Sequence, residues 1–288
     1  MIIKCDYGRM GNRLHTHANA LAWCIQNNYN LLNLSFTEYS HFFHGKPDIY
    51  TYSSDLLSFF LSKNFLKKLL SKICMSMKWL NRFSLIFTTI HRSDTECLTE
   101  EELNHISKKS NFFLIVKAWD LDFRYSLTSE SIHVRSILSP KKNISVENAK
   151  NKIHKLKSKH DCIVGVHARR GDYKNYLNGK HYHSWFDYKN WIIQSKSVFC
   201  EAGYKRPYFI VCSDDKTDET FFLNLPVYLT NENDPIHDLH LLSLCDFNFG
   251  PPSSFGTWIS WYGNVSRAII SKGTRISSIK QFTICESC

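Results

Sequence analysis

The residues best suited to chemistry follow an apolar run near the middle of the chain. Residues 163–173 read IVGVHARRGDY, so His167, Arg169, Arg170 and Asp172 come at the carboxyl end of the run. The planar guanidinium of arginine can hold two phosphate oxygens at once, which a lysine ammonium does not do. Ligands of open α/β sheets bind outside the carboxyl ends of the strands. The segment therefore predicts a site for a phosphate-bearing ligand.

Two later segments place polar residues in the same way. Residues 209–215, FIVCSDD, form a predicted strand that ends at Asp214 and Asp215. Residues 244–258, LCDFNFGPPSSFGTW, bring Ser253 and Ser254 directly after a glycine-proline turn. Serine hydroxyls and the backbone N–H groups at a helix start are suited to binding an anion.

Near the N-terminus a glycine turn follows another short apolar run. Residues 8–13 read GRMGNR, which puts Gly11 and Asn12 between a predicted strand and a predicted helix. Strand, glycine turn, helix and strand is the opening of a βαβ unit. The N-terminal part is therefore predicted to begin as a nucleotide-binding type of fold.

These four segments, in this order, resemble the motifs of the α1,2-fucosyltransferase family, and the 163–173 segment occurs in looser form in α1,6- and protein O-fucosyltransferases. Residues 37–110 match none of these motifs. The resemblance implies a GT-B fold, with two Rossmann-like doubly wound domains facing a cleft. It implies an inverting, metal-independent transfer of L-fucose from GDP-fucose to a glycan hydroxyl, with an α1,2-linkage to galactose. It implies no cofactor beyond this donor substrate.

The same resemblance implies how the phosphates of the donor are held. Arg169 would grip the β-phosphate, with His167 and Arg170 alongside it. Ser253 and Ser254 would offer hydroxyl and backbone N–H groups to the diphosphate. Fixed cations at the β-phosphate would stabilise the departing GDP without a magnesium ion.

Other residues would contact the base and the sugar. Asp214 or Asp215 would accept hydrogen bonds from the guanine or the ribose, and Phe255 would pack on the nucleotide. Gly11 and Asn12 would reach the phosphate or the sugar from the N-terminal side of the cleft.

A base that deprotonates the acceptor hydroxyl is not evident from the sequence. Asp172, the predicted catalytic partner of Arg169, is one candidate for this base. His15 and His17 are further candidates. A dissociative reaction, in which the leaving group departs early, needs little help from a base.

The elements around these segments alternate between strand and helix patterns. Predicted strands cover residues 2–7, 29–36, 112–116, 162–166, 208–212 and 227–229. Predicted helices follow Gly11 up to about Asn28 and cover 55–83, 184–202 and 236–245, with a further helix and linker in 140–159. Two βα-rich halves predict an acceptor-side domain at 1–150 and a donor-binding domain at 151–288.

The helix predicted at residues 55–83 has six lysines and arginines, one acid and a broad apolar face. Such a helix can lie on an anionic membrane. The hypothesis is that it brings the enzyme to an acceptor at the membrane surface. The alternative is a helix that packs its apolar face on the core and leaves a solvated basic face.

Composition and charge narrow the class of protein. The chain has 288 residues, 43% of them hydrophobic and 22% charged, which is typical of a globular protein. It lacks an apolar leader before its first charged residues, and its ten cysteines are scattered, so we expect reduced thiols and a cytoplasmic location. The charge-free stretch 247–266 contains prolines and glycines, which favours a buried strand and helix over a membrane span.

A formal charge of +10 indicates an anionic partner. A nucleic-acid binder would use the basic stretches at 63–82 and 141–159, although no nucleic-acid-binding module is recognisable. A metal-dependent glycosyltransferase would use Asp120 and Asp122, because hard cations bind carboxylate oxygens. Both readings are alternatives to the metal-independent transfer. For that transfer we expect no metal site and no nucleic-acid partner.

Overall fold

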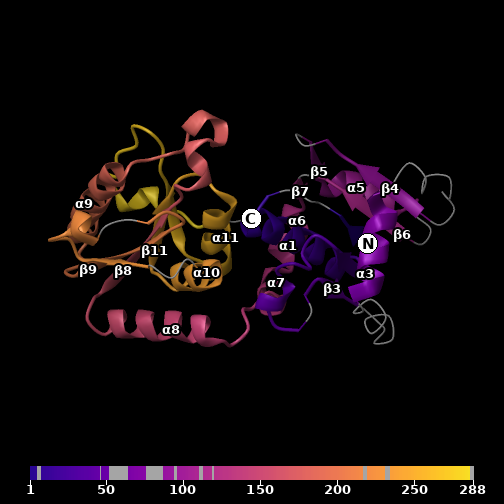
Figure 1. The fold of residues 1–288 in the computed structure, drawn as a ribbon, viewed down its shortest axis with the longest axis horizontal. Helices are drawn as coiled ribbons and strands as arrows, with labels where there is room; N and C mark the ends of the chain where they lie inside the picture. The colour runs from indigo at the N-terminus through magenta and orange to yellow at the C-terminus, as the bar shows by residue number, and fades with distance from the viewer. Residues whose placement is uncertain are drawn as a thin grey trace. The chain divides into compact units, whose positions relative to one another are not determined.

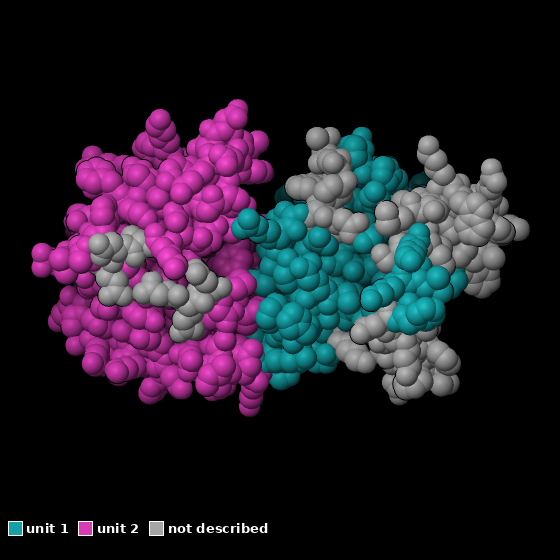
Figure 2. All heavy atoms as spheres, viewed as in Figure 1, with its two compact units in different colours: residues 1–141, 287–288 teal, residues 142–286 magenta. Residues whose placement is uncertain are grey.

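The computed structural model describes residues 1–4, 8–45, 47–51, 64–75, 87–93, 96–109, 113–118, 120–216, 219–230 and 234–285. The chain divides into two compact units, here named unit 1, built on Met1–Lys141, and unit 2, Lys142–Glu286 (Figure 2). The boundary expected at 150/151 falls inside helix α8 (Ile144–Lys157), and α8 belongs wholly to unit 2.

Unit 1 contains a five-stranded sheet with the strand order β3-β2-β1-β6-β4. Its strands are β1 (Ile2–Ile3), β2 (Leu31–Asn33), β3 (Ile49–Tyr50), β4 (Phe87–His91) and β6 (Phe113–Lys117). The neighbours β2–β1, β1–β6 and β6–β4 pair in parallel, and only the edge strand β3 pairs antiparallel. A separate parallel pair joins β5 (Cys97–Thr99) to β7 (Asp120–Asp122).

The described helices of unit 1 are α1 (Met10–Gln26), α3 (Asn64–Met75), α5 (Glu100–Ser107), α6 (Arg124–Ser129) and α7 (Ser131–Ile137). Helix α1 contains the apolar run ALAWC, which is fully buried, and it packs against β2, β7 and α6. It begins just after Gly8, whose φ of +67° is a left-handed conformation that glycine adopts without strain. The glycine turn predicted from the sequence therefore leads directly into this helix.

Unit 2 contains a five-stranded, wholly parallel sheet with the order β10-β9-β8-β11-β12. Its strands are β8 (Cys162–Ala168), β9 (Pro207–Ser213), β10 (Val227–Leu229), β11 (Phe247–Gly250) and β12 (Ser266–Ile269). Parallel strands end at the same edge of a sheet. The residues that follow the adjacent strands β9, β8 and β11 are therefore brought together.

Helices cover both faces of this sheet. They are α8, α9 (Trp185–Glu201), α10 (Pro235–Ser243) and α11 (Ser254–Gly263). Helix α9 lies on one side of the sheet, and α8 and α10 pack together on the other (Figure 1). Each N-terminus has a side-chain cap, from Asn143, Ser184, Asp234 and Ser253 respectively for α8 to α11, which satisfies N–H groups that a helix start leaves open.

The central strand β8 distributes its side chains by the period of two. Cys162, Val164, Val166 and Ala168 join the core cluster that also contains the buried side of α9. The alternate residues must then face the opposite helices. Accordingly, a Cβ on Gly165 would lie 2.7 Å from a Leu242 methyl group of α10. His167, two residues further on, therefore points toward the α11 side.

The predicted α/β fold is confirmed, with a five-stranded sheet in each unit whose strands pair in parallel except at the edge strand β3. The strands predicted at 162–166, 208–212 and 227–229 are present as β8, β9 and β10, and the charge-free stretch 247–266 contains β11 and α11. Of the helix predicted at 55–83, the described part is α3, and the flanking residues lie outside the described ones. No helix within the described ranges has the length and apolar character needed to cross a membrane.

Candidate active site

Arg169 follows the central strand β8 and is held by two carboxylates. Its Nη2 lies 2.9 Å from Oδ2 of Asp172, and its Nη1 lies 3.2 Å from Oδ2 of Asp214. The side chain is 18% exposed. Because both ion pairs fix the guanidinium while part of it stays accessible, Arg169 is preorganised to bind an anion.

Asp214 follows β9 and also fixes the backbone after β8. Its Oδ1 accepts hydrogen bonds from the backbone N–H groups of Arg170, at 2.8 Å, and Gly171, at 2.9 Å. Burial alone would raise the pKa of Asp214, but these two bonds and the charge of Arg169 outweigh it and lower the pKa. A Cβ on Gly171 would lie 2.9 Å from Oδ2 of Asp214. The glycine of the ARRGD segment therefore allows this carboxylate to approach.

Arg170 has a different setting from the one expected. Its guanidinium donates to Oδ2 of Asp215 at 3.1 Å, to the carbonyl of His183 at 2.5 Å and to the hydroxyl of Tyr182 at 2.8 Å. It also lies over the rings of Tyr182 and Trp185, and its side chain is only 8% exposed. These contacts anchor the loop after β8 inside unit 2. They also occupy the guanidinium, which leaves it little capacity to bind a phosphate.

His167 is buried and neutral. Its Nδ1 lies 3.3 Å from Oγ of Ser253, and its ring centroid is 5.0 Å from that of Phe255. Burial, with the charges of Arg267 and Arg169 adding to it, lowers the pKa of His167 to about 3. At neutral pH the imidazole therefore offers one N–H donor and one acceptor, and it adds no positive charge.

The turn between β11 and α11 forms the other wall of the site. Oγ of Ser253 accepts a hydrogen bond from the backbone N–H of Gly256 at 3.0 Å, and Ser254 is the first residue of α11. The hydroxyl of Tyr173 donates to the carbonyl of Pro252 at 2.7 Å, which links this turn to the loop after β8. The first N–H groups of a helix carry partial positive charge, so the turn favours an anion.

Nine predicted site residues thus lie at or after the carboxyl ends of three adjacent strands of one sheet. His167 is near the end of β8, and the others follow β8, β9 or β11: Arg169, Arg170, Asp172, Asp214, Asp215, Ser253, Ser254 and Phe255. Gly11 and Asn12 belong instead to α1 of unit 1, where the side chain of Asn12 lies against Gly8.

Sequence reasoning overlooked several residues of this region. Tyr173 belongs to the recognised segment, and its spacing from the arginines was an available signal. The aromatic groups around Arg170 lie beyond the segment, and Arg267 of β12 belongs to no motif. Only the fold brings these side chains to the site.

Two other groups that the sequence analysis singled out are held by contacts within unit 1. His17 is fully buried and stacks on Phe36 with a ring distance of 4.3 Å, so it is a core residue and not a base for a substrate. Asp120 and Asp122 form β7, and Oδ1 of Asp122 accepts from Nε of Arg124 at 2.9 Å. Within the described part of the chain, no three His, Cys, Asp or Glu side chains are grouped as metal ligands.

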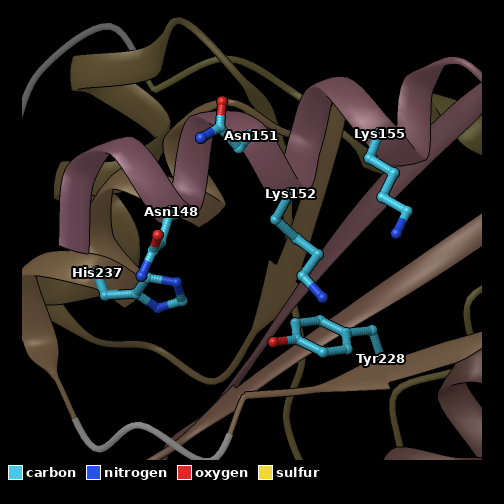
Figure 3. Close-up of a pocket in the computed structure, with 6 residues that line it drawn as sticks. All are labelled: Asn148, Asn151, Lys152, Lys155, Tyr228 and His237. Carbon is cyan, nitrogen blue, oxygen red and sulfur yellow. The ribbon is translucent and has the colours of Figure 1, made fainter. Parts of the chain in front are cut away.

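A cavity of about 330 Å³ lies elsewhere in unit 2, between α8, β10 and α10 (Figure 3). It is lined by Asn148, Asn151, Lys152, Lys155, Tyr228 and His237. Nζ of Lys152 lies 3.8 Å from the centre of the Tyr228 ring. None of the predicted site residues is among the six, so this cavity is distinct from the Arg169 region.

Solved structures of other proteins are similar to this chain at low sequence identity. The structure of Arabidopsis thaliana FUT1, as a mutant in complex with GDP, is 14% identical, with a TM-score of 0.59 over 93% of this chain and 70% of that chain. The fucosyltransferase NodZ from Bradyrhizobium is 14% identical, with a TM-score of 0.49 over 95% of each chain. No curated protein matches the chain.

A family model identifies the chain more directly than these distant structures do. The model described as Glycosyl transferase family 11 matches residues 121–276, more than half of the chain. The match contains β8, β9, β11 and the residues that follow them. The chain belongs to glycosyl transferase family 11 and is a glycosyltransferase.

Proposed function

We propose that this enzyme transfers L-fucose from GDP-fucose to a glycan hydroxyl, with inversion and without a metal, forming an α1,2-linkage to galactose. The observation that carries the proposal is the clamped and partly exposed Arg169 guanidinium, which lies over the ring of Tyr173, whose hydroxyl is hydrogen-bonded to the turn that precedes α11. A fixed cation next to open helix N–H groups is suited to a diphosphate leaving group. The GDP held by the Arabidopsis structure is consistent with a guanine nucleotide donor.

Breaking the bond between the sugar and the diphosphate makes the sugar oxocarbenium-like and leaves negative charge on GDP. Arg169 would stabilise that charge, and Asp172 and Asp214 would keep its fork oriented. The N–H groups of Ser254 and Phe255 would supply further donors. An acceptor hydroxyl that attacks from the face opposite the leaving group would then invert the anomeric centre.

The neighbouring residues would make other contacts with the donor. Both oxygens of Asp214 already have partners within unit 2, so we assign the contact with the guanine or ribose to Asp215. Phe255 would pack on the nucleotide. Neutral His167 would donate one hydrogen bond, provided that the Ser253 hydroxyl donates to Nδ1 and leaves the proton on Nε2.

The two units would divide the substrates between them. Unit 2, which contains Arg169 and the β11–α11 turn, would bind the donor. Unit 1 would bind the acceptor, with Gly11 and Asn12 reaching the phosphate or the sugar. A peripheral contact of α3 with an anionic membrane would bring unit 1 to its acceptor.

A transfer assay tests this function. The enzyme is incubated with GDP-fucose and galactose-terminated glycans in EDTA, and the product is identified by mass spectrometry and its linkage by NMR. We expect a single added fucose, α1,2-linked, with equal yield in EDTA and in manganese. Loss of turnover in EDTA, restored by manganese and abolished by Asp122→Asn, would favour a metal-dependent enzyme instead.

A further inference from the structure

Arg267 is a buried cation beneath the start of α11. It lies on β12 and is 3% exposed. Its Nη2 donates to the carbonyl of Pro251 at 2.6 Å and, at 3.4 Å, to that of Gly250. The guanidinium also contacts Gly256 in the first turn of α11, where a Cβ would overlap it. Arg267 thus supports the turn that carries Ser253.

Arg267 forms no ion pair with a carboxylate among the residues that the structure describes, and the acidic groups that act on its charge are the thiol of Cys285 and the phenol of Tyr173. Its Nη1 is buried and has no hydrogen-bond partner there either. Two other buried cations differ: Lys67 pairs with Asp48, and Arg170 pairs with Asp215. Burying a charge without a counter-charge is costly, so an unpaired buried guanidinium calls for an explanation.

The field of this charge reaches the candidate site. It contributes to lowering the pKa of His167, and it also acts on the phenol of Tyr173, which donates to the carbonyl of Pro252. Burial lowers the pKa of Arg267 itself to about 10, which leaves the guanidinium charged at neutral pH. The missing counter-charge is therefore expected on the side of the β11–α11 turn.

We propose that Arg267 is a positioning residue whose buried charge complements the diphosphate of a bound nucleotide. It holds the carbonyls of Gly250 and Pro251, so that the first N–H groups of α11 face the ligand. Its positive charge adds to the partial positive charge at the N-terminus of α11. This inference rests on the proposed function, because it needs a diphosphate at the start of α11.

Binding of guanosine and GDP, measured by displacement of a fluorescent GDP analogue, separates this role from a merely structural one. In Arg267→Gln, we expect GDP to bind roughly ten- to a hundredfold more weakly, the usual effect of losing a charged interaction. Guanosine, which has no phosphate, should bind within about threefold of the unmodified enzyme. The matched control is Arg275→Gln, which removes an exposed charge of unit 2 and should leave both ligands unaffected.

Arg267→Lys keeps the charge but not the paired bonds to the carbonyls. We expect it to lower the thermal unfolding temperature while it keeps the preference for GDP over guanosine, and it decides the matter if Arg267→Gln does not fold. Equal weakening of guanosine and GDP in Arg267→Gln, or loss of the GDP preference in a folded Arg267→Lys, would overturn the inference. An unmodified enzyme without a preference for GDP over guanosine would instead contradict the proposed function.

Discussion

At the scale of single residues, the adjacent arginines Arg169 and Arg170 have different surroundings. Arg169 is clamped by carboxylates and remains partly exposed, whereas Arg170 is enclosed by aromatic rings, a carbonyl and Asp215. The sequence shows only that both follow a buried strand. The difference between the partly exposed Arg169 and the enclosed Arg170 comes from the packing of residues 182–185 against the loop.

Replacement of Arg169 tests its proposed role at the leaving group. Arg169→Ala should lower kcat about 100- to 1000-fold, because it removes a donor whose interaction strengthens as the phosphate gains charge. Arg169→Lys should recover little, since lysine keeps the charge but not the planar fork. The measurement is steady-state transfer from GDP-fucose, with Arg275→Ala as the exposed control. A fully active lysine variant would mean that Arg169 acts only as a diffuse charge.

At the scale of elements, α3 presents an exposed face that is both basic and apolar. Phe65 is 76% exposed, and Lys68, Leu69 and Lys72 share its face at helical spacing. Lys67, in contrast, is buried in an ion pair with Asp48, so it cannot be part of a lipid contact. The sequence pattern had placed Lys67 with the other cations of this helix.

Vesicle co-sedimentation tests the membrane hypothesis for this face. The enzyme should sediment with anionic vesicles at low salt and not with neutral ones. Lys68→Glu with Lys72→Glu should weaken the binding roughly tenfold or more, since each basic residue near such a surface contributes about 1 kcal/mol. The matched control reverses Lys155 and Lys159, which are exposed in unit 2. Recovery in the supernatant with both vesicle types would end the hypothesis.

The elements show why part of the site could be predicted and part could not. Strand β8 and the arginines after it are contiguous in sequence, so an apolar run followed by charge was sufficient to predict them. The ion pair between Arg169 and Asp214 joins residues 45 positions apart. The motifs made Asp214 a predicted site residue, but they did not predict that it would pair with Arg169. Arg267 has no motif around it. Its proximity to Pro251 depends on the pairing of β11 with β12, which no local pattern encodes.

At the scale of the whole molecule, both units contain buried neutral histidines. Burial lowers the pKa of His17 in unit 1 and of His240 in unit 2 to about 4 each. In the unfolded chain their pKa returns to about 6.5. The unfolded chain therefore binds more protons than the folded one below that pH. Their contribution to stability is complete above about pH 6.5 and is lost as the pH falls toward 4.

Chemical denaturation at pH 7.5 and pH 5 measures this loss. Each histidine should lower the free energy of unfolding by about 2 kcal/mol at pH 5 relative to pH 7.5. His17→Gln and His240→Gln should each reduce the difference between the two pH values by that amount. His154→Gln replaces an exposed histidine and should leave the difference unchanged. If His17→Gln keeps the full pH dependence, His17 is not held neutral in the folded protein.

The central claim is that a guanine nucleotide binds at the carboxyl edge of the unit 2 sheet through Arg169, and isothermal titration calorimetry tests it most directly. GDP should bind the unmodified enzyme at least about tenfold more tightly than UDP or ADP, because a carboxylate such as Asp215 accepts hydrogen bonds from the guanine amino edge. Arg169→Ala should weaken GDP binding, whereas Lys152→Gln, in the separate cavity beside α8, should not. Equal affinity for UDP and GDP, or GDP binding lost in Lys152→Gln and kept in Arg169→Ala, would contradict the account.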